Sequence, residues 1–253
     1  MEGDVELVAL RSKLEQALVD VEGWLFLDEA WALHEAIRNL KTNGQPPTAV
    51  EIGSWKGRST VALALGIKAR GGGTVFAIDP HTGSPGTTAV GPVVTATDFQ
   101  RNIAAAGVDS LVKLLVTTSH AARPKFAAKS VDLLFIDGSH EYEDVVRDIT
   151  DWQTALKDES AVAFNDPTAP GVYRALRELV LKPRSTYRSP SLIQNTLVFT
   201  FRRGQSWESR DAVALIELRT VLRLKLHATP FWPYIPRWFV RIAHSVSRRM
   251  VGS

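Results

Sequence analysis

The chain has 253 residues, of which 45% are hydrophobic and 23% are charged, a balance typical of a soluble globular protein. It contains no cysteine, which excludes disulfides, thiolate metal sites and a cysteine nucleophile, so any metal would be held by oxygen or imidazole ligands. The net charge is only +3, and the basic excess lies after Leu218, so the rest of the chain shows no nucleic-acid footprint.

The amino terminus predicts neither a secretory signal nor a membrane anchor. Met1 to Asp4 is acidic and is followed by an amphipathic pattern, whereas a secretory signal is first basic and then apolar. No long uncharged apolar run follows. We therefore expect a cytoplasmic protein without a transmembrane helix.

Two helices are predicted before the first strand. Apolar residues recur at helical spacing from Leu7 to Val21, and again from Glu29 to Leu40. Between them, residues 23–27 form an apolar elbow. We expect Trp24 in this elbow to pack on the core in preference to lining a ligand crevice.

Strands and helices then alternate along the chain. Strands are predicted at 48–52, 75–78, 112–116, 131–136 and 161–164, and helices at 59–69, 99–106, 142–152 and 172–180. A closing strand or strand pair is predicted at 191–201, and a long loop at 80–94. This order predicts a Rossmann-like α/β fold, with a mostly parallel sheet, helices on both faces and an antiparallel edge strand.

Three domains or segments follow from these patterns. Residues 1–47 are expected to form an N-terminal helical cap, residues 48–204 the sheet-containing core, and residues 205–253 a basic amphipathic extension. The extension either docks on the core, covers the acceptor cleft, pairs two protomers into a homodimer, or lies on an anionic membrane surface.

The first predicted strand contains Glu51 and is followed by a glycine turn from Gly53 to Gly57. Two other apolar runs, at 75–78 and 131–136, end in the carboxylates Asp79 and Asp137. The turn does not fit a dinucleotide fingerprint, because Trp55 stands where a second glycine would admit a pyrophosphate. Its spacing also differs from that of a Walker loop. A ligand with adenine and ribose but no pyrophosphate remains, and S-adenosylmethionine fits that description.

Residues 50–60, 77–79 and 135–142 resemble the motifs of class I S-adenosylmethionine-dependent methyltransferases. The last motif, with residues 165–172, resembles more narrowly a subfamily of small-molecule and sugar O-methyltransferases, some of which depend on magnesium. Asn165 departs from this subfamily, which usually has histidine there, and would offer a neutral amide oxygen.

The resemblance implies a role for each motif residue. Asp79 would bind the ribose hydroxyls and Ser119 would lie by the adenine, while Glu51 would either bind the methionine ammonium group or brace the loop. The full set of implied cofactor-binding residues is Glu51, Gly53, Ser54, Gly57, Ser59, Thr60, Asp79, Ser119 and Asp137.

The acceptor end of the implied site is acidic. Asp137, Asn165 and Asp166 would hold Mg²⁺, which prefers oxygen ligands and lowers the pKa of a bound hydroxyl. His140 is the predicted catalytic base, with Asp137 as the alternative. In the alternative without a catalytic role, Asp137 and Asp166 would be helix caps or turn residues, and His140 would cap its helix or pack at its start.

These implied roles predict an enzyme that methylates a hydroxyl of a small molecule, expected to be a sugar or polyol in polysaccharide biosynthesis. Two rival functions remain open at this point. One is a peripheral membrane methyltransferase that acts on a lipid-linked acceptor. The other is a cofactor-binding scaffold without catalysis. We expect no nucleic-acid partner.

Overall fold

Seven strands form one sheet in the computed structural model, which describes residues 2–83, 94–182 and 185–204, and their order is β3-β2-β1-β4-β5-β7-β6. The strands are β1 (Thr48–Ile52), β2 (Thr74–Ile78), β3 (Val112–Leu115), β4 (Val131–Ile136), β5 (Leu156–Asn165), β6 (Tyr187–Ile193) and β7 (Thr196–Phe201). Strands β1 to β5 run parallel, and β7 runs antiparallel between β5 and β6. The predicted Rossmann-like sheet with an antiparallel edge is confirmed.

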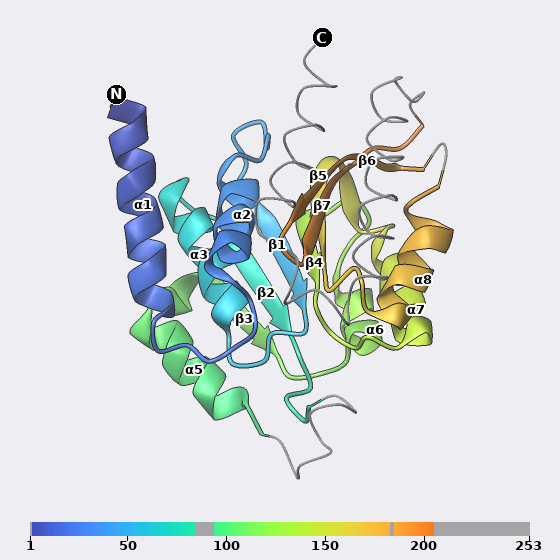
Figure 1. Ribbon diagram of the computed structural model, residues 1–253, viewed down its shortest axis with the longest axis horizontal. Helices are drawn as coiled ribbons and strands as arrows, with labels where there is room; N and C mark the ends of the chain where they lie inside the picture. The colour runs from blue at the N-terminus through green and yellow to red at the C-terminus, as the bar shows by residue number, and fades with distance from the viewer. Residues whose placement is uncertain (1, 84–93, 183–184, 205–253) are drawn as a thin grey trace, which may run out of the picture.

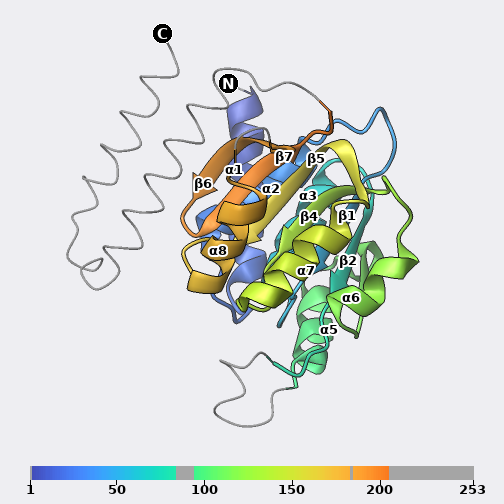
Figure 2. The ribbon, with the colours of Figure 1, turned by 90° about the vertical axis from the view of Figure 1, so that its right-hand side faces the viewer.

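Helices cover both faces of the sheet. They are α1 (Glu2–Leu18), α2 (Leu27–Arg38), α3 (Arg58–Ala69), α5 (Ala96–Ala105), α6 (Ser119–Ala122), α7 (Tyr142–Trp152) and α8 (Pro170–Leu179), with short 3-10 turns at Asp109–Leu111 and Arg123–Lys125. Helices α1, α2, α3 and α5 lie on one side of the sheet and α6, α7 and α8 on the other (Figure 1). Figure 2 looks onto this second layer.

The central strand β4 is buried at all of its positions, as expected for a parallel strand covered on both faces. Its side chains alternate between two hydrophobic cores. Leu133 and Phe135 pack with α2 and α3, whereas Leu134 and Ile136 pack with α7 and α8. The continuous apolar run in the sequence thus reflects burial on both faces.

The strand order reverses at β1, which has β2 on one side and β4 on the other. In open parallel sheets, ligands bind beyond the carboxyl ends of the strands at such a reversal. Gly53, Asp79 and Asp137 follow directly after β1, β2 and β4. The fold therefore brings the three sequence motifs to one edge.

Two strands begin several residues earlier than the sequence predicts. β5 begins at Leu156, five residues before the predicted start at residue 161. The charged Lys157 interrupts the apolar pattern from which the strand was predicted. The Nζ atom of Lys157 lies 2.8 Å from both carboxylate oxygens of Asp132 at the start of β4. The closing segment is a strand pair that begins earlier than predicted, at Tyr187, and turns at residues 194–195.

The predicted extension at 205–253 and most of the loop predicted at 80–94 lie outside the described residues. The division into cap, core and extension stays a prediction. Within the described part of the chain, no helix has both the length and the hydrophobicity that a membrane crossing requires.

Candidate active site

A pocket of about 790 Å³ opens at the carboxyl ends of β1, β2, β4 and β5. It is also lined by the elbow between α1 and α2 and by the start of α6. The predicted site residues that line it are Gly53, Ser54, Ser59, Asp79, Ser119, Asp137, His140, Asn165 and Asp166. The other three, Glu51, Gly57 and Thr60, are buried beside the same turn and do not line the pocket.

Asp79 holds the glycine turn in shape. Its Oδ2 atom accepts hydrogen bonds from the backbone N–H groups of Ser54 and Trp55, both at 2.8 Å, and its Oδ1 atom accepts one from the N–H of His81 at 2.6 Å. A carboxylate oxygen can accept two hydrogen bonds, so Oδ1 keeps capacity for one further donor. The residue predicted to bind ribose therefore also organises the turn.

The turn needs glycine at both of its ends. Gly53 has a φ of +83°, and an added Cβ atom would lie 2.3 Å from the carbonyl oxygen of Asp137. Gly57 has a φ of +90° just before α3, where a Cβ atom would lie 3.2 Å from side-chain atoms of Phe99 and Ile103. Both positions combine left-handed backbone with close packing, which other residues do not tolerate.

Buried polar groups surround this turn. The Oγ atom of Ser54, which lies in the pocket wall, and the Oε1 atom of Glu51 have no hydrogen-bond partner among the described residues. Burial raises the pKa of Glu51 to about 7, although hydrogen bonds from the Ser59 and Thr60 side chains lower it in part. Glu51 thus braces the start of α3, and the unpartnered Oγ atom of Ser54 is buried within the turn.

Asp137 and Asn165 meet at the other end of the pocket. Burial raises the pKa of Asp137 well above its ordinary value, and the carboxylates of Asp166 and Glu51 add to this effect. A hydrogen bond with the Asn165 side chain opposes the shift, because it favours the ionised carboxylate. The Oδ1 atom of Asn165 lies 3.1 Å from the Thr196 hydroxyl, which places it away from Asp137.

His140 sits at the pocket mouth. Its Nε2 atom lies 3.7 Å from Oδ2 of Asp166, which is longer than a hydrogen bond, and its side chain is 44% exposed. A Cβ atom at Gly171 would lie 2.2 Å from the His140 carbonyl oxygen, so glycine at the start of α8 lets this loop close. The structure brings His140 and Asp166 together without a tight pair.

The predicted magnesium site finds only partial support in this geometry. Asp137 and Asp166 lie close enough for their charges to repel, and a cation would relieve that repulsion. Asn165, however, turns its oxygen to Thr196. No group of three His, Cys, Asp or Glu side chains among the described residues is placed to hold a metal ion. As a three-ligand set, the residues do not fit the metal in this arrangement.

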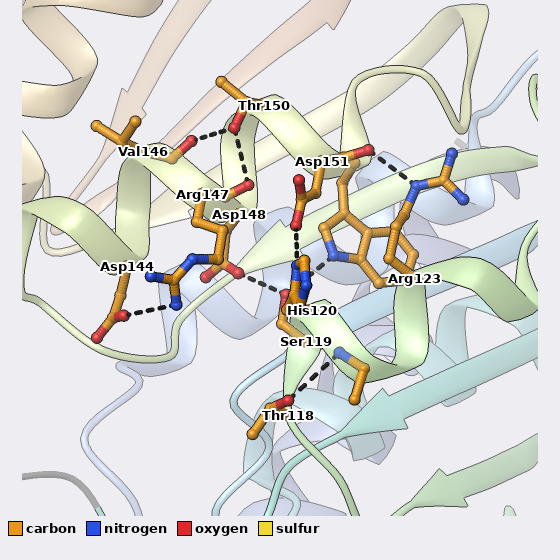
Figure 3. A network of polar contacts seen from close by, with 12 residues as sticks. Thr118, Ser119, His120, Arg123, Asp144, Val146, Arg147, Asp148, Thr150 and Asp151 are labelled. Atoms are coloured by element: carbon orange, nitrogen blue, oxygen red, sulfur yellow. Dashed lines mark hydrogen bonds and ion pairs between the residues drawn. The ribbon is translucent and has the colours of Figure 1, made fainter.

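Ser119 belongs to a network of polar contacts between the start of α6 and helix α7 (Figure 3). Its hydroxyl donates to Asp148 and accepts a hydrogen bond from Nε1 of Trp152 at 2.9 Å. Burial raises the pKa of Asp148 to about 6. The neighbouring His120 places Nδ1 2.7 Å from Oδ2 of Asp151. The serine predicted to lie by adenine is therefore held through its hydroxyl by α7.

The elbow between α1 and α2 forms the remaining wall. Trp24 is 69% exposed and lines the pocket, so the expectation that it packs on the core is wrong and the alternative is right. Its ring lies 5.3 Å from that of Trp55, centroid to centroid. Arg58 fixes the elbow in place, because its guanidinium donates hydrogen bonds to the backbone carbonyls of Leu18, Val21 and Leu25.

Several pocket residues were missed by sequence reasoning. Arg58 directly follows the glycine turn, but nothing in the sequence showed that its partners would be main-chain carbonyls. Trp55 was considered in the sequence only as a residue that excludes a dinucleotide-binding turn, and no place in the pocket wall was predicted for it. Asp148 was given no role, and its spacing from Asp144 on one face of the predicted helix at 142–152 was the available signal.

Comparisons with known proteins agree with this architecture. Residues 50–167 match a family model described as a methyltransferase domain. Among solved structures, cofactor-bound Rv0187 from MTB is 18% identical, with a TM-score of 0.55, and the match covers 79% of this chain and 90% of that one. The chain has the fold of a class I methyltransferase.

Two further structures show the same likeness. The O-methyltransferase TomG from Streptomyces achromogenes, involved in tomaymycin synthesis and solved in complex with SAM, is 18% identical, with a TM-score of 0.52 over 77% of this chain and 90% of that one. An O-methyltransferase from Bacillus cereus in complex with SAH is 15% identical, with a TM-score of 0.53 over 76% and 91%. No curated protein matches the sequence.

Proposed function

We propose that this protein transfers the methyl group of S-adenosylmethionine to a hydroxyl oxygen of a small molecule. One observation carries the proposal: a single pocket joins the Gly53 turn and Asp79 to the acidic group at Asp137 and Asp166. The match of residues 50–167 to a methyltransferase domain supports it, and so do the named O-methyltransferases that share the fold.

The donor end of the pocket suits a nucleoside with an amino-acid arm. Asp79 keeps acceptor capacity on Oδ1 for a ribose hydroxyl, and Ser54 lines the pocket beside it. Ser119 and the wall around it would border the adenine. When bound, the donor supplies an electrophilic methyl group on its sulfonium.

At the acceptor end, Asp137 is placed to take the proton of the attacking hydroxyl. Asp137 lines the pocket, and burial raises the pKa of its carboxyl, which makes it a stronger base than an ordinary aspartate. His140, the base predicted from the sequence, is more exposed and stands 3.7 Å from Asp166. We therefore propose that Asp137 removes the proton of the attacking hydroxyl and that His140 helps to orient the acceptor. No step passes through magnesium, whose role stays a prediction from the resemblance.

We further propose a sugar hydroxyl as the acceptor. The motifs, the leading helices and the basic tail together resemble the mycobacterial sugar O-methyltransferase that caps the 1-hydroxyl of methylated mannosides in methylmannose polysaccharide assembly. The exposed ring of Trp24 beside the pocket offers a flat apolar face on which a sugar ring can pack.

The test combines binding with turnover. Calorimetric titration of the full chain with S-adenosylmethionine and its demethylated product should give saturable one-site binding. Labelled donor should then pass its methyl group to members of a panel of sugars, phenols and lipid-linked sugars. Binding without transfer to any acceptor would support the scaffold function instead. Transfer to lipid-linked acceptors alone would support the membrane enzyme.

A further inference from the structure

A buried carboxylate outside the pocket stands behind its acidic end. Glu29, in the first turn of α2, is 1% exposed. Its Oε2 atom accepts a hydrogen bond from the N–H of Phe26 at 2.8 Å, and its Oε1 atom accepts one from the N–H of Asn195 at 2.7 Å. Glu29 therefore ties the start of α2 to the turn between β6 and β7.

Thr196 extends this contact toward the pocket. The fully buried Thr196 hydroxyl shares its one proton between two acceptors, Oε1 of Glu29 and Oδ1 of Asn165, each 3.1 Å from its oxygen. Thr196 and Asn165 are paired across the ladder between β7 and β5. The ladder fixes both Cα positions, so the hydroxyl meets the amide oxygen without any movement of the backbone.

The orientation of the Asn165 amide follows from these contacts. An amide has its oxygen and its NH2 group on opposite sides, so an oxygen turned to Thr196 leaves the NH2 group facing away from β7. Asp137 lies on that side, because Ile136 and Phe164 are paired in the ladder between β4 and β5 and the next residues, Asp137 and Asn165, follow at the same level. Of the two ends of the amide, only the NH2 group can donate a hydrogen bond to a carboxylate. Asn165 and Asp137 line the pocket, whereas Glu29 and Thr196 do not.

We propose that Glu29 and Thr196 are positioning residues for methyl transfer, which hold Asn165 with its NH2 group, and not its oxygen, directed at Asp137. The inference rests on the proposed function, because it concerns how Asp137 is presented to the acceptor. It makes Asn165 a hydrogen-bond donor that aligns a carboxylate. It also explains how an asparagine serves at a position where the resembled subfamily has histidine.

The first test compares two substitutions at residue 196. Thr196→Val removes the hydroxyl at nearly constant volume, and Thr196→Ser keeps it. We expect Thr196→Val to lower kcat by about tenfold or more while the KM for the donor changes by less than about twofold. Thr196→Ser should keep kcat within about threefold. An unchanged kcat in the valine variant, or an equal loss in both variants, would overturn the proposal.

The second test separates a donor from a metal ligand at residue 165. Asn165→Asp keeps the shape of the side chain and replaces the NH2 group by a negatively charged oxygen. A donor role predicts that kcat falls about tenfold or more, even with saturating MgCl2. Retained or increased turnover, with tighter dependence on MgCl2, would show that residue 165 is a ligand and would refute the donor role.

A third measurement does not depend on activity, so it separates failure of this inference from failure of the proposed function. The side-chain NH2 signals of Asn165, assigned by their loss in Asn165→Asp, should exchange slowly with solvent in the unmodified chain and in Thr196→Ser. They should exchange faster in Thr196→Val. Equal exchange in all three would contradict the positioning role, whatever the chain does with methyl donors. Absence of transfer alongside the expected exchange would count against the proposed function alone.

Discussion

The carbonyl oxygen of Asp137 occupies the space in which a side chain on Gly53 would lie, since a Cβ atom there would approach it to 2.3 Å. The ends of β1 and β4 can therefore close only around a residue without a side chain. Gly53→Ala should cost about 2–5 kcal/mol of stability, through its left-handed φ and the clash. It should also abolish donor binding. Urea unfolding and calorimetry measure both effects.

The matched control for Gly53→Ala is Gly138→Ala, at the second residue after β4. A Cβ atom at residue 138 would lie 3.4 Å from a methyl group of Ile52, an ordinary contact, and its φ is not left-handed. This variant should unfold within about 1 kcal/mol of the unmodified protein. Similar losses in both variants would mean that close packing at residue 53 is not the cause.

Asp79 has a double role that substitution should reveal. Asp79→Ala leaves three backbone N–H groups, those of Ser54, Trp55 and His81, without their acceptor. We expect a loss of about 1–3 kcal/mol in stability and at least about tenfold weaker binding of S-adenosylmethionine. Titration calorimetry checks the affinity. Undisturbed affinity would show that the acid neither shapes the turn nor meets the ribose. The exposed Asp109→Ala serves as the control.

Asp166 should affect turnover without affecting donor binding. Its φ is 46°, a left-handed conformation that asparagine tolerates better than alanine, so Asp166→Asn is the better probe. The charge of Asp166 raises the pKa of Asp137, and its removal should move the acidic limb of the pH–kcat profile to lower pH. We expect kcat to fall about a hundredfold. Comparable damage to the donor Kd would contradict this division between the two ends of the pocket.

Glu51 should make the protein less stable as pH rises through the neutral range. The folded pKa is about 7 against an ordinary value of 4.5, so the folded state keeps a proton that the unfolded chain has released. Stability from this group is complete below about pH 4.5 and is lost as pH rises to about 7. Glu51→Gln should flatten this decline. Unfolding free energies at pH 5.5 and 7.5 measure it, and parallel curves for the two proteins would exclude Glu51 as the cause.

Metal removal tests the arrangement at Asp137 and Asn165. Because the Asn165 oxygen is turned to Thr196, we expect methyl transfer to persist within about twofold in excess EDTA. Rates are compared with the same enzyme in MgCl2. Loss of turnover in EDTA that MgCl2 alone restores would reinstate the magnesium site implied by the resemblance.

The sheet and the edge that carries the site could be predicted because their signals are local. Apolar runs such as 131–136 mark strands buried on both faces, and the acids Asp79 and Asp137 come directly after such runs. Parallel strands end on the same edge, so topology alone brings these acids together. The likeness of the fold to known methyltransferases agrees with that reading.

Side-chain direction could not be predicted in the same way. Whether Asn165 offers its oxygen or its NH2 group depends on Thr196, a partner distant in sequence whose pairing appears only in the folded sheet. Trp24 was misjudged because an apolar elbow resembles core, and nothing local shows that the elbow passes over a pocket. The start of β5 was missed because the charged Lys157 interrupts the apolar pattern that marks strands.

The hydrogen bonds from Arg58 to the elbow allow the side chains of the elbow to be changed. All three of its acceptors there are main-chain carbonyls, so the bonds do not depend on which side chains residues 18–25 carry. The elbow can thus accept new residues at Trp24 while its path over the pocket is retained. Libraries that vary residue 24 and keep Arg58 can therefore be screened for activity on new acceptors, while the donor end of the pocket stays unchanged.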